Sequence, residues 1–588
     1  MAANILFPFS SCAVATYSRA PPKVPPAAAA LGTKNVRPRA SYETVEPAVA
    51  RRSANYQPTV WTDDFIQSLK SDYSGDVHVQ RMEELQKAVG HSLKEVGGPL
   101  AKLELINDLQ RLGVGRLFER EINDILNAMH TDYDEKEKER WDVRFTALYF
   151  RLLRGRGFDV SQEIFSRFMD GTGNFQTSLS NDPNGLLSLY EASYLCMPGE
   201  SILDEANAFA RRHLKDLKEK DIHPSIAMQV EHALELPIHW RMPRLDCRWY
   251  ITMYEHKDGM NPLLLELAKL DFNTLQSIHR SELRKGSRWW SELGVAEKLS
   301  FARDRLMEDY QWAMGIVFEP QFGHCREVLT KPIQLITTID DMYDVYGSLD
   351  ELELFTDAVA RWNINAMESL PDYMKLCFLV LYNTTNEAGY EFLREHGVDI
   401  IPHLRKAWAD YCKAGLQEAR WVNSKYTPSL DEYLNNAWTS ISGPLMLTHA
   451  FFFHGQKPSK EALHCFTTHQ DLMRWSSTVF RLTDDLGTSE EEMAKGDVPK
   501  SIQCHMHEAG VPVEMAREHI KGVIRDTWRK MNKYLTDPSP LPKPFIASAF
   551  DLARTSTCVY LYGDGFGVPD GENKENIMSL LVYPIPLH

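Results

Sequence analysis

Apolar residues recur every three or four positions along most of this chain, which is the spacing of one face of an α-helix. The pattern begins at Trp61 and continues with Phe65, Leu69, Met82, Leu85, Val89, Leu103, Ile106 and Leu109. No sustained alternation of period two, which would indicate half-buried strands, accompanies it. The sequence therefore predicts an all-α protein.

A helix start divides this pattern near residue 261. Asn261 stands directly before Pro262, and asparagine at an N-cap with proline at the first helical position favours the start of a helix. A chain of 588 residues is also too long for one ordinary domain. We predict two helical domains, residues 51–260 and residues 261–588.

Three carboxylates follow an apolar helical run in residues 331–347. Because an α-helix turns about 100° per residue, Asp340 and Asp344 should lie one turn apart on a single face, with Asp341 beside them. Isolated carboxylates are costly to bury, so a buried set needs cations, and oxygen ligands suit Mg²⁺. A solvated acidic turn is the alternative that a DDxxD motif alone leaves open.

A second set of oxygen ligands favours a metal site over a solvated acidic turn. Asp484, Thr488 and Glu492 are spaced i, i+4 and i+8, so each is displaced by about 40° from the last along one stripe of a helix. All three side chains can therefore contact one or two metal ions. Two such helices facing each other would form a pocket with acidic walls and metal between them.

Basic residues near both acidic sets complete a candidate anion site. They are Arg303 and Arg305 before the first set, and Arg481 and Lys500 around the second. The planar fork of arginine binds phosphate oxygens in pairs, and lysine adds a point charge. Each of them taken singly is more often a surface charge.

Together these motifs resemble those of plant class I terpene synthases. The resemblance rests on the DDxxD motif, the Asp484/Thr488/Glu492 pattern, the RxR pair and the segment Gly496-Asp-Val-Pro-Lys-Ser-Ile-Gln, and it extends from about Arg51 to the C-terminus. The pair Arg51-Arg52, followed after eight residues by Trp61, resembles the tandem-arginine motif of the monoterpene branch.

The resemblance implies an N-terminal relic α-barrel and a C-terminal catalytic α-bundle. It implies metal binding by Asp340, Asp341, Asp344, Asp484, Thr488 and Glu492, with three Mg²⁺ ions or Mn²⁺. The N-terminal domain lacks the DxDD acid motif of the wider family, so we expect it to be structural, with Arg51, Arg52 and Trp61 capping the other domain.

The resemblance also points to residues of the substrate pocket. Trp312 would offer a π-face to a carbocation. Tyr562 and Asp564 lie in Tyr560-Leu-Tyr-Gly-Asp-Gly-Phe-Gly, which resembles the family's last active-site segment. Ile333 stands seven residues before the first metal aspartate, where some limonene and cineole synthases carry Asn. That difference disfavours placement of water by this residue, and with it cineole as product.

Composition narrows the possible partners and compartments. A net charge of −16 is a poor match to nucleic acid, which is bound mainly by neutralising phosphates. No run of about 18 apolar residues predicts a membrane span. The nine cysteines are irregularly spaced and form no CxxC pair, which argues against a disulfide scaffold or a zinc ribbon. The resemblance implies a small-molecule prenyl diphosphate as the partner, and we expect a monomer.

The first residues have the composition of an organellar targeting segment. Residues 1–42 contain no Asp or Glu, carry five basic residues and are rich in Ala and Pro. We predict a plastid transit peptide over residues 1–50, with the mature protein in the chloroplast stroma. An ordinary N-terminal tail is the alternative.

Two further features each have two interpretations. Gly443-Pro444 interrupts an apolar helical run, so we expect a kink whose freed carbonyl groups face a cation or, equally, a kink that serves packing. Cys504, His505 and His507 fall within one helical turn, but metal ligands on one helix are usually spaced i and i+4, which favours a packing role.

The resemblance, together with the predicted transit peptide and the tandem arginines, implies metal-dependent ionisation of geranyl diphosphate in a plastid. The resulting carbocation would be cyclised or quenched to a C10 olefin or alcohol, and diphosphate would be released. A sesquiterpene synthase acting on farnesyl diphosphate is the nearest alternative. A chain-elongating prenyltransferase would carry a second DDxxD motif, and a helical scaffold would show internal repeats. Neither is evident.

Overall fold

The computed structural model describes residues 51, 53, 56–70, 73, 75–133, 135–217, 222–495, 499–568 and 571–587, without the side chains of residues 135–136 and 490–495. The predicted transit peptide, Arg52 and the side chain of Glu492 thus lie outside the described residues. Residues 51–588 form one compact unit. Across the described residues the only β interaction is an isolated bridge between Met169 and Phe175. The all-α prediction is confirmed.

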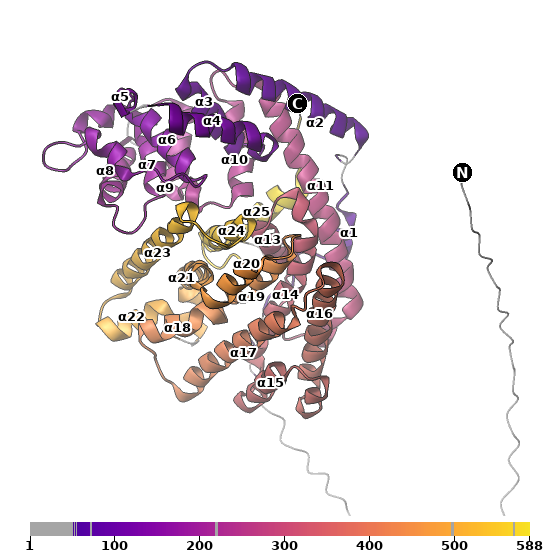
Figure 1. The fold of residues 1–588 in the computed structure, drawn as a ribbon. Coiled ribbons are helices and arrows are strands. Elements are labelled where there is room, and N and C mark those ends of the chain that lie inside the picture. The colour runs from indigo at the N-terminus through magenta and orange to yellow at the C-terminus, as the bar shows by residue number, and fades with distance from the viewer. Residues whose placement is uncertain are drawn as a thin grey trace, which may run out of the picture. The chain divides into compact units, whose positions relative to one another are not determined.

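The described residues before position 261 form ten α-helices, most of them labelled in Figure 1. They are α1 (Asp63–Ser68), α2 (Asp76–Glu95), α3 (Pro99–Arg111), α4 (Glu119–Asp132), α5 (Glu135–Lys138), α6 (Val143–Arg154), α7 (Pro183–Ser193), α8 (Ser201–Leu217), α9 (Pro224–Glu235) and α10 (Pro243–Glu255).

The remaining helices include the longest of the described chain and those that carry the acidic motifs. They are α11 (Pro262–Leu293), α12 (Val295–Lys298), α13 (Leu306–Ile316), α14 (Gly323–Asp341), α15 (Leu349–Arg361), α16 (Asp372–His396), α17 (Ile401–Ser424), α18 (Leu430–Ser440), α19 (Gly443–Phe453), α20 (Lys460–Thr468), α21 (Asp471–Lys495), α22 (Ser501–Ala509), α23 (Val513–Thr536), α24 (Lys543–Val559) and α25 (Glu572–Ile577). Two π-helical turns, Met342–Tyr346 and Met578–Val582, follow α14 and α25.

Two hydrophobic cores correspond to two helical domains, and α11 contributes to both. Leu283 belongs to the core of the N-terminal helices, whereas Trp290 belongs to the core of the C-terminal helices. Asn261 caps α11 as predicted, because its side chain accepts hydrogen bonds from the backbone NH groups of Leu263 and Leu264. Figure 1 shows α11 running from the N-terminal helices along the C-terminal group. The exact boundary at residue 261 stays a prediction.

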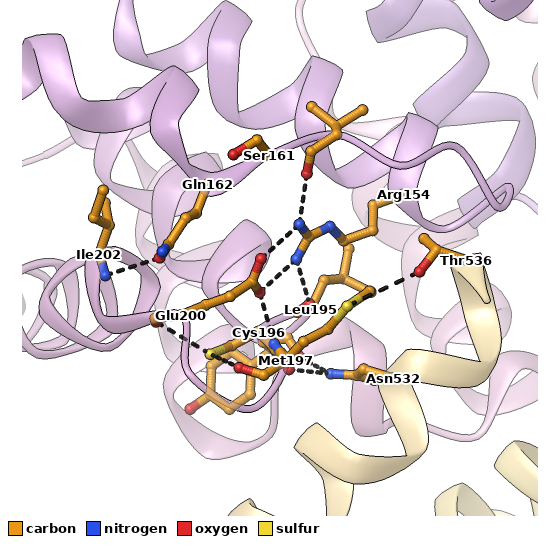
Figure 2. Close-up of polar contacts among 12 residues, drawn as sticks. Arg154, Ser161, Gln162, Leu195, Cys196, Met197, Glu200, Ile202, Asn532 and Thr536 are labelled. Carbon is orange, nitrogen blue, oxygen red and sulfur yellow. Dashed lines mark hydrogen bonds and ion pairs between the residues drawn. The ribbon is translucent and has the colours of Figure 1, made fainter.

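Polar contacts join the two groups of helices where α23 meets the N-terminal ones (Figure 2). The amide nitrogen of Asn532 donates hydrogen bonds to the carbonyl groups of Tyr194 and Cys196, at 3.0 and 2.9 Å. The loop that presents Cys196 is held by the buried ion pair between Arg154 and Glu200, at 2.6 Å. Because loop carbonyl groups need partners when buried, these bonds fix the contact between the domains.

The helical run is interrupted between α18 and α19, so two separate helices replace the single kinked helix that we expected at Gly443-Pro444. Ser442 adopts a left-handed conformation, with φ of +68°, and Pro444 opens a new helix instead of bending an old one. A Cβ atom on Gly443 would lie 2.2 Å from Ser477 Oγ on α21, so only glycine allows this close approach. The break therefore presents backbone, rather than a continuous helix face, to the interior beside α21.

Candidate functional site

A cavity of about 610 Å³ lies among the C-terminal helices and contains most of the predicted site residues. Its walls come from α13, α14, α21, the π-helical turn after α14 and the break between α18 and α19. Ten predicted residues line it: Arg303, Trp312, Ile333, Asp340, Asp344, Arg481, Asp484, Thr488, Lys500 and Asp564. The volume lies in the range of small-molecule sites.

The first acidic wall is formed where α14 passes into its π-helical turn. Asp340 and Asp344 both line the cavity, as the helical spacing predicted. Such wider turns are frequent at functional sites, and here the turn begins immediately after Asp341. Asp341 itself is fully buried behind the wall and points to Arg303.

Arg303 forms ion pairs with two carboxylates of the first acidic set, Asp340 and Asp341. Its Nη2 atom lies 2.9 Å from Asp340 Oδ2 and 2.8 Å from Asp341 Oδ1, and its backbone NH donates to Asp341 Oδ2 at 2.6 Å. These carboxylates raise the pKa of Arg303 despite its burial, so the guanidinium stays charged. The first acidic set is therefore partly neutralised by the protein itself.

The second wall is the stripe of α21 that carries Asp484 and Thr488. Arg481 forms ion pairs with Asp484 and with Asp485, whose Oδ1 lies 2.7 Å from Arg481 Nε. Asp485 is completely buried and also accepts hydrogen bonds from the Tyr433 hydroxyl, at 3.0 and 3.1 Å, and from the backbone NH of Ser501, at 3.0 Å. Asp485 thus fixes Arg481 and ties α21 to α18 and to the start of α22.

Aromatic side chains form a further wall of the cavity. The ring of Trp312 lies 4.6 Å from that of Phe480 and 6.2 Å from that of Tyr560, measured between centroids. All three residues line the cavity. Their π-faces are able to stabilise positive charge that is kept away from water.

The structure places several predicted residues away from the cavity surface. Tyr562 is 59% exposed and its hydroxyl donates to Glu235. Arg305 is fully buried and contacts backbone carbonyl groups. Arg51 lies beside α15, where its two terminal nitrogens each lie 2.9 Å from an oxygen of Glu351. This pairing lowers the pKa of Glu351 to about 2.

Trp61, which we expected to help cap the C-terminal domain, is buried. Its indole NH donates to Glu308 Oε1 on α13 at 3.0 Å. Burial raises the pKa of Glu308 to about 7. Arm and helix are therefore joined by a hydrogen bond whose acceptor titrates near neutral pH.

Some cavity residues escaped the sequence analysis. Tyr56, Phe566 and residues 440–442 line the cavity but were not predicted as site residues. Phe480 lies four residues before Asp484, so extending the same helical stripe backwards would have found it. Tyr56 comes from a segment without regular structure and Phe566 from a turn, far apart in the sequence, and no periodicity indicates them.

The cavity offers oxygen donors that fit hard divalent cations. Asp340 and Asp344 face it from one wall, Asp484 and Thr488 from the other. Among the residues whose side chains are described, no three His, Cys, Asp or Glu side chains are gathered closely enough to hold one metal ion. Arg303 contacts Asp340, and Arg481 contacts Asp484. The side chain of Glu492, the third member of the second set, lies outside the described residues. The chemistry of the donors suits Mg²⁺ or Mn²⁺.

The rival cluster at Cys504, His505 and His507 gathers no ligands. Cys504 is buried in a small cluster with Trp421, and the ring of His505 stacks on His519, 3.9 Å between centroids. All eight cysteines of the described chain are free. No described helix has the length and apolar character to cross a bilayer.

Comparison with known proteins gives one consistent result. Residues 60–234 match the family model of the terpene synthase N-terminal domain, and residues 291–530 match that of the terpene synthase metal-binding domain. A chloroplastic monoterpene synthase of Cananga odorata is 70% identical over 590 aligned positions that cover both chains completely.

Solved structures agree with the sequence matches. A limonene synthase bound to 2-fluorolinalyl diphosphate is 44% identical with a TM-score of 0.89, covering 91% of this chain and all of that one. Isoprene synthase from grey poplar leaves, solved with three Mg²⁺ ions and dimethylallyl-S-thiolodiphosphate, is 46% identical with a TM-score of 0.83, covering 90% of this chain and 99% of that one.

Proposed function

This chain belongs to the terpene synthase family, an enzyme family with a metal-binding domain, and we propose that it is a plastidial monoterpene synthase. Its substrate is geranyl diphosphate, which it ionises to a carbocation that is cyclised or quenched to a C10 olefin or alcohol, with release of diphosphate. The observation that carries this proposal is the cavity itself, in which two acidic walls and two arginines meet an aromatic wall.

The acidic walls are assigned to metal and the basic residues to diphosphate. Asp340, Asp344, Asp484 and Thr488 would hold the ions, with Asp341 behind the first wall and Glu492 completing the second. Bound Mg²⁺, three ions by analogy with the isoprene synthase complex, or Mn²⁺ would neutralise charge on the departing diphosphate.

Arg303, Arg481 and Lys500 bind the diphosphate end of the substrate. Arg303 and Arg481 are each held by a buried aspartate, Asp341 and Asp485, so little reorganisation is needed when charge develops on the leaving group. Lys500 stands at the N-cap of α22 and lines the same cavity. Interactions that strengthen as the C–O bond breaks act on the transition state.

The other end of the cavity orients the prenyl chain. Trp312, Phe480 and Tyr560 provide apolar surface before ionisation and π-faces afterwards. Ile333 contributes an aliphatic wall with no group that would place water. Tyr56 and Phe566 cover Arg303 and help to exclude water.

The name of one relative bears on the compartment of the protein, and the lining of the cavity bears on its oligomeric state. The Cananga odorata protein is named as chloroplastic, which supports a plastid location, and we place this protein in the stroma. We further propose that it acts as a monomer, because the residues of one chain are enough to supply the acidic, basic and aromatic walls of the cavity. Sedimentation of the purified protein at micromolar concentration would test that assignment.

Assays with two substrates test the proposed function. Protein beginning at Arg51 should convert geranyl diphosphate with Mg²⁺ and act on farnesyl diphosphate with kcat/KM at least about tenfold lower, because five more carbons must fit the same cavity. Gas chromatography identifies the products, and Asp340→Ala serves as the inactive control. Equal or better use of farnesyl diphosphate would support the sesquiterpene alternative instead.

A further inference from the structure

The motif Arg303-Asp304-Arg305 contacts two segments that are distant in the sequence. We call residues 56–61 the N-terminal arm and residues 563–567 the C-terminal loop. The guanidinium of Arg303 lies over the rings of Tyr56 and Phe566, with its carbon 4.7 and 5.6 Å from their centroids. Both rings line the cavity, so the arm and the loop meet at its edge.

Arg305 contacts the next residue of each segment. Its Nη2 atom donates to the carbonyl oxygen of Gln57 at 3.0 Å and to that of Gly567 at 3.2 Å. Its Nη1 atom donates to the carbonyl oxygen of Asp304 at 3.0 Å. The side chain is fully buried and does not line the cavity. One guanidinium nitrogen thus bridges the arm and the loop.

The loop is built to present this carbonyl. Asp564 Oδ1 accepts hydrogen bonds from the backbone NH groups of Phe566, at 3.2 Å, and Gly567, at 2.6 Å. Asn573 donates to the carbonyl oxygen of Gly565 at 2.8 Å and pairs reciprocally with Gln311 on α13. The turn around Gly567 is therefore fixed locally, and Arg305 connects an already shaped loop to the arm.

We propose that Arg305 is a positioning residue that clasps the N-terminal arm to the C-terminal loop at the edge of the cavity, and not a diphosphate ligand. The planar fork of arginine suits this role, because it offers several donors in fixed directions, whereas lysine offers one point of attachment. The consequence for catalysis rests on the proposed function: joined segments keep Tyr56 and Phe566 over the cavity and water out of it.

Hydrogen exchange of the free protein tests the clasp without any substrate. In Arg305→Lys, backbone amides of both segments should exchange about tenfold faster than in the wild type, the factor expected from losing one bond of a charged donor. Arg280→Lys is the matched control, because Arg280 is also buried and donates to carbonyl groups, those of Lys70, Leu581 and Val582, none of which belongs to the arm or the loop. Unchanged exchange in either segment of Arg305→Lys would overturn the clasp.

Product analysis tests the consequence for water. With geranyl diphosphate, Arg305→Lys should raise the ratio of alcohol to olefin products at least about twofold, while KM changes less than that ratio. If the Lys variant does not fold, Arg305→Gln, which keeps an amide donor for one carbonyl, takes its place. An unchanged product ratio would overturn the role in excluding water. A wild type that forms no product from geranyl diphosphate would instead refute the proposed function, and hydrogen exchange would still decide the clasp.

Discussion

Replacing Glu308 by glutamine should stabilise the protein at pH 8 and have little effect at pH 5. Burial raises the pKa of this carboxyl from 4.5 to about 7, so the folded state favours its protonated form. Ionisation above pH 7 then costs about 3 kcal/mol relative to the unfolded chain, and at pH 5 the cost is below about 1 kcal/mol. Glutamine keeps an acceptor for the Trp61 indole and removes the charge.

The groups around Glu308 do not reverse the sign of this effect. Arg305 lowers its pKa and Asp304 raises it, and both contribute less than burial. Asp309, also buried, has its own pKa raised by burial and by Glu308, so removing the charge of Glu308 relieves this neighbour too. Stability should therefore fall in the wild type as the pH rises from about 4.5 to 7, and the variant should escape that loss.

Thermal unfolding measures the difference. Unfolding entropy of about 2.1 cal/mol/K per residue amounts to roughly 1 kcal/mol/K for this chain, so about 3 kcal/mol corresponds to a rise in Tm of about 3 °C at pH 8. Glu95→Gln, which removes the same charge from an exposed position of α2, controls for net charge. A Tm gain equal at pH 5 and pH 8, or a loss at pH 8, would refute the reasoning.

Three further predictions concern the cavity and the arm. Asp340→Ala should lower kcat at least about a hundredfold in steady-state assays with Mg²⁺, while scanning calorimetry should show Tm unchanged within about 1 °C. Near-normal turnover by the folded variant would refute the metal assignment. Tyr433→Phe removes a donor to the fully buried Asp485, so Tm should fall by about 2 °C and kcat should fall more than KM changes; an unaltered Tm would count against this hydrogen bond. Glu351→Gln should lower Tm at pH 7 but not near pH 2, because the depressed pKa of this carboxyl contributes stability above about 4.5 that is lost as the pH falls through 2; an equal loss at both pH values would contradict the ion pair with Arg51.

Helical periodicity predicted the secondary structure class and both acidic walls. The spacing of Asp340 and Asp344, and of Asp484 and Thr488, was enough to predict that each pair faces the same side. These residues lie on regular or nearly regular helices, where the separation in sequence determines the direction in which a side chain projects. The break after α18 was wrongly predicted as a kink, since neither the left-handed conformation of Ser442 nor the close approach of Ser477 to Gly443 is indicated by residue type or spacing.

Contacts between distant segments could not be predicted from one sequence. The RxR pair suggested two equivalent phosphate ligands, yet only Arg303 lines the cavity, and Arg305 contacts residues about 250 positions away on either side. Neither Gln57 nor Gly567 offers a side chain that would indicate the bond, because both contribute backbone carbonyl groups. Such contacts are determined by the fold and not by residue type.

The pairing of Arg303 with Asp340 and Asp341 has a consequence for how substrate arrives. Because Arg303 is already paired with two carboxylates and the chain has a net charge of −16, the protein offers little long-range attraction to a free diphosphate. We expect encounter with the anion to be slowed by repulsion, and salt to speed it by screening, the opposite of electrostatically steered enzymes. A diphosphate that arrives already bound to its cations escapes this repulsion, so the association rate should depend on the concentration of that complex.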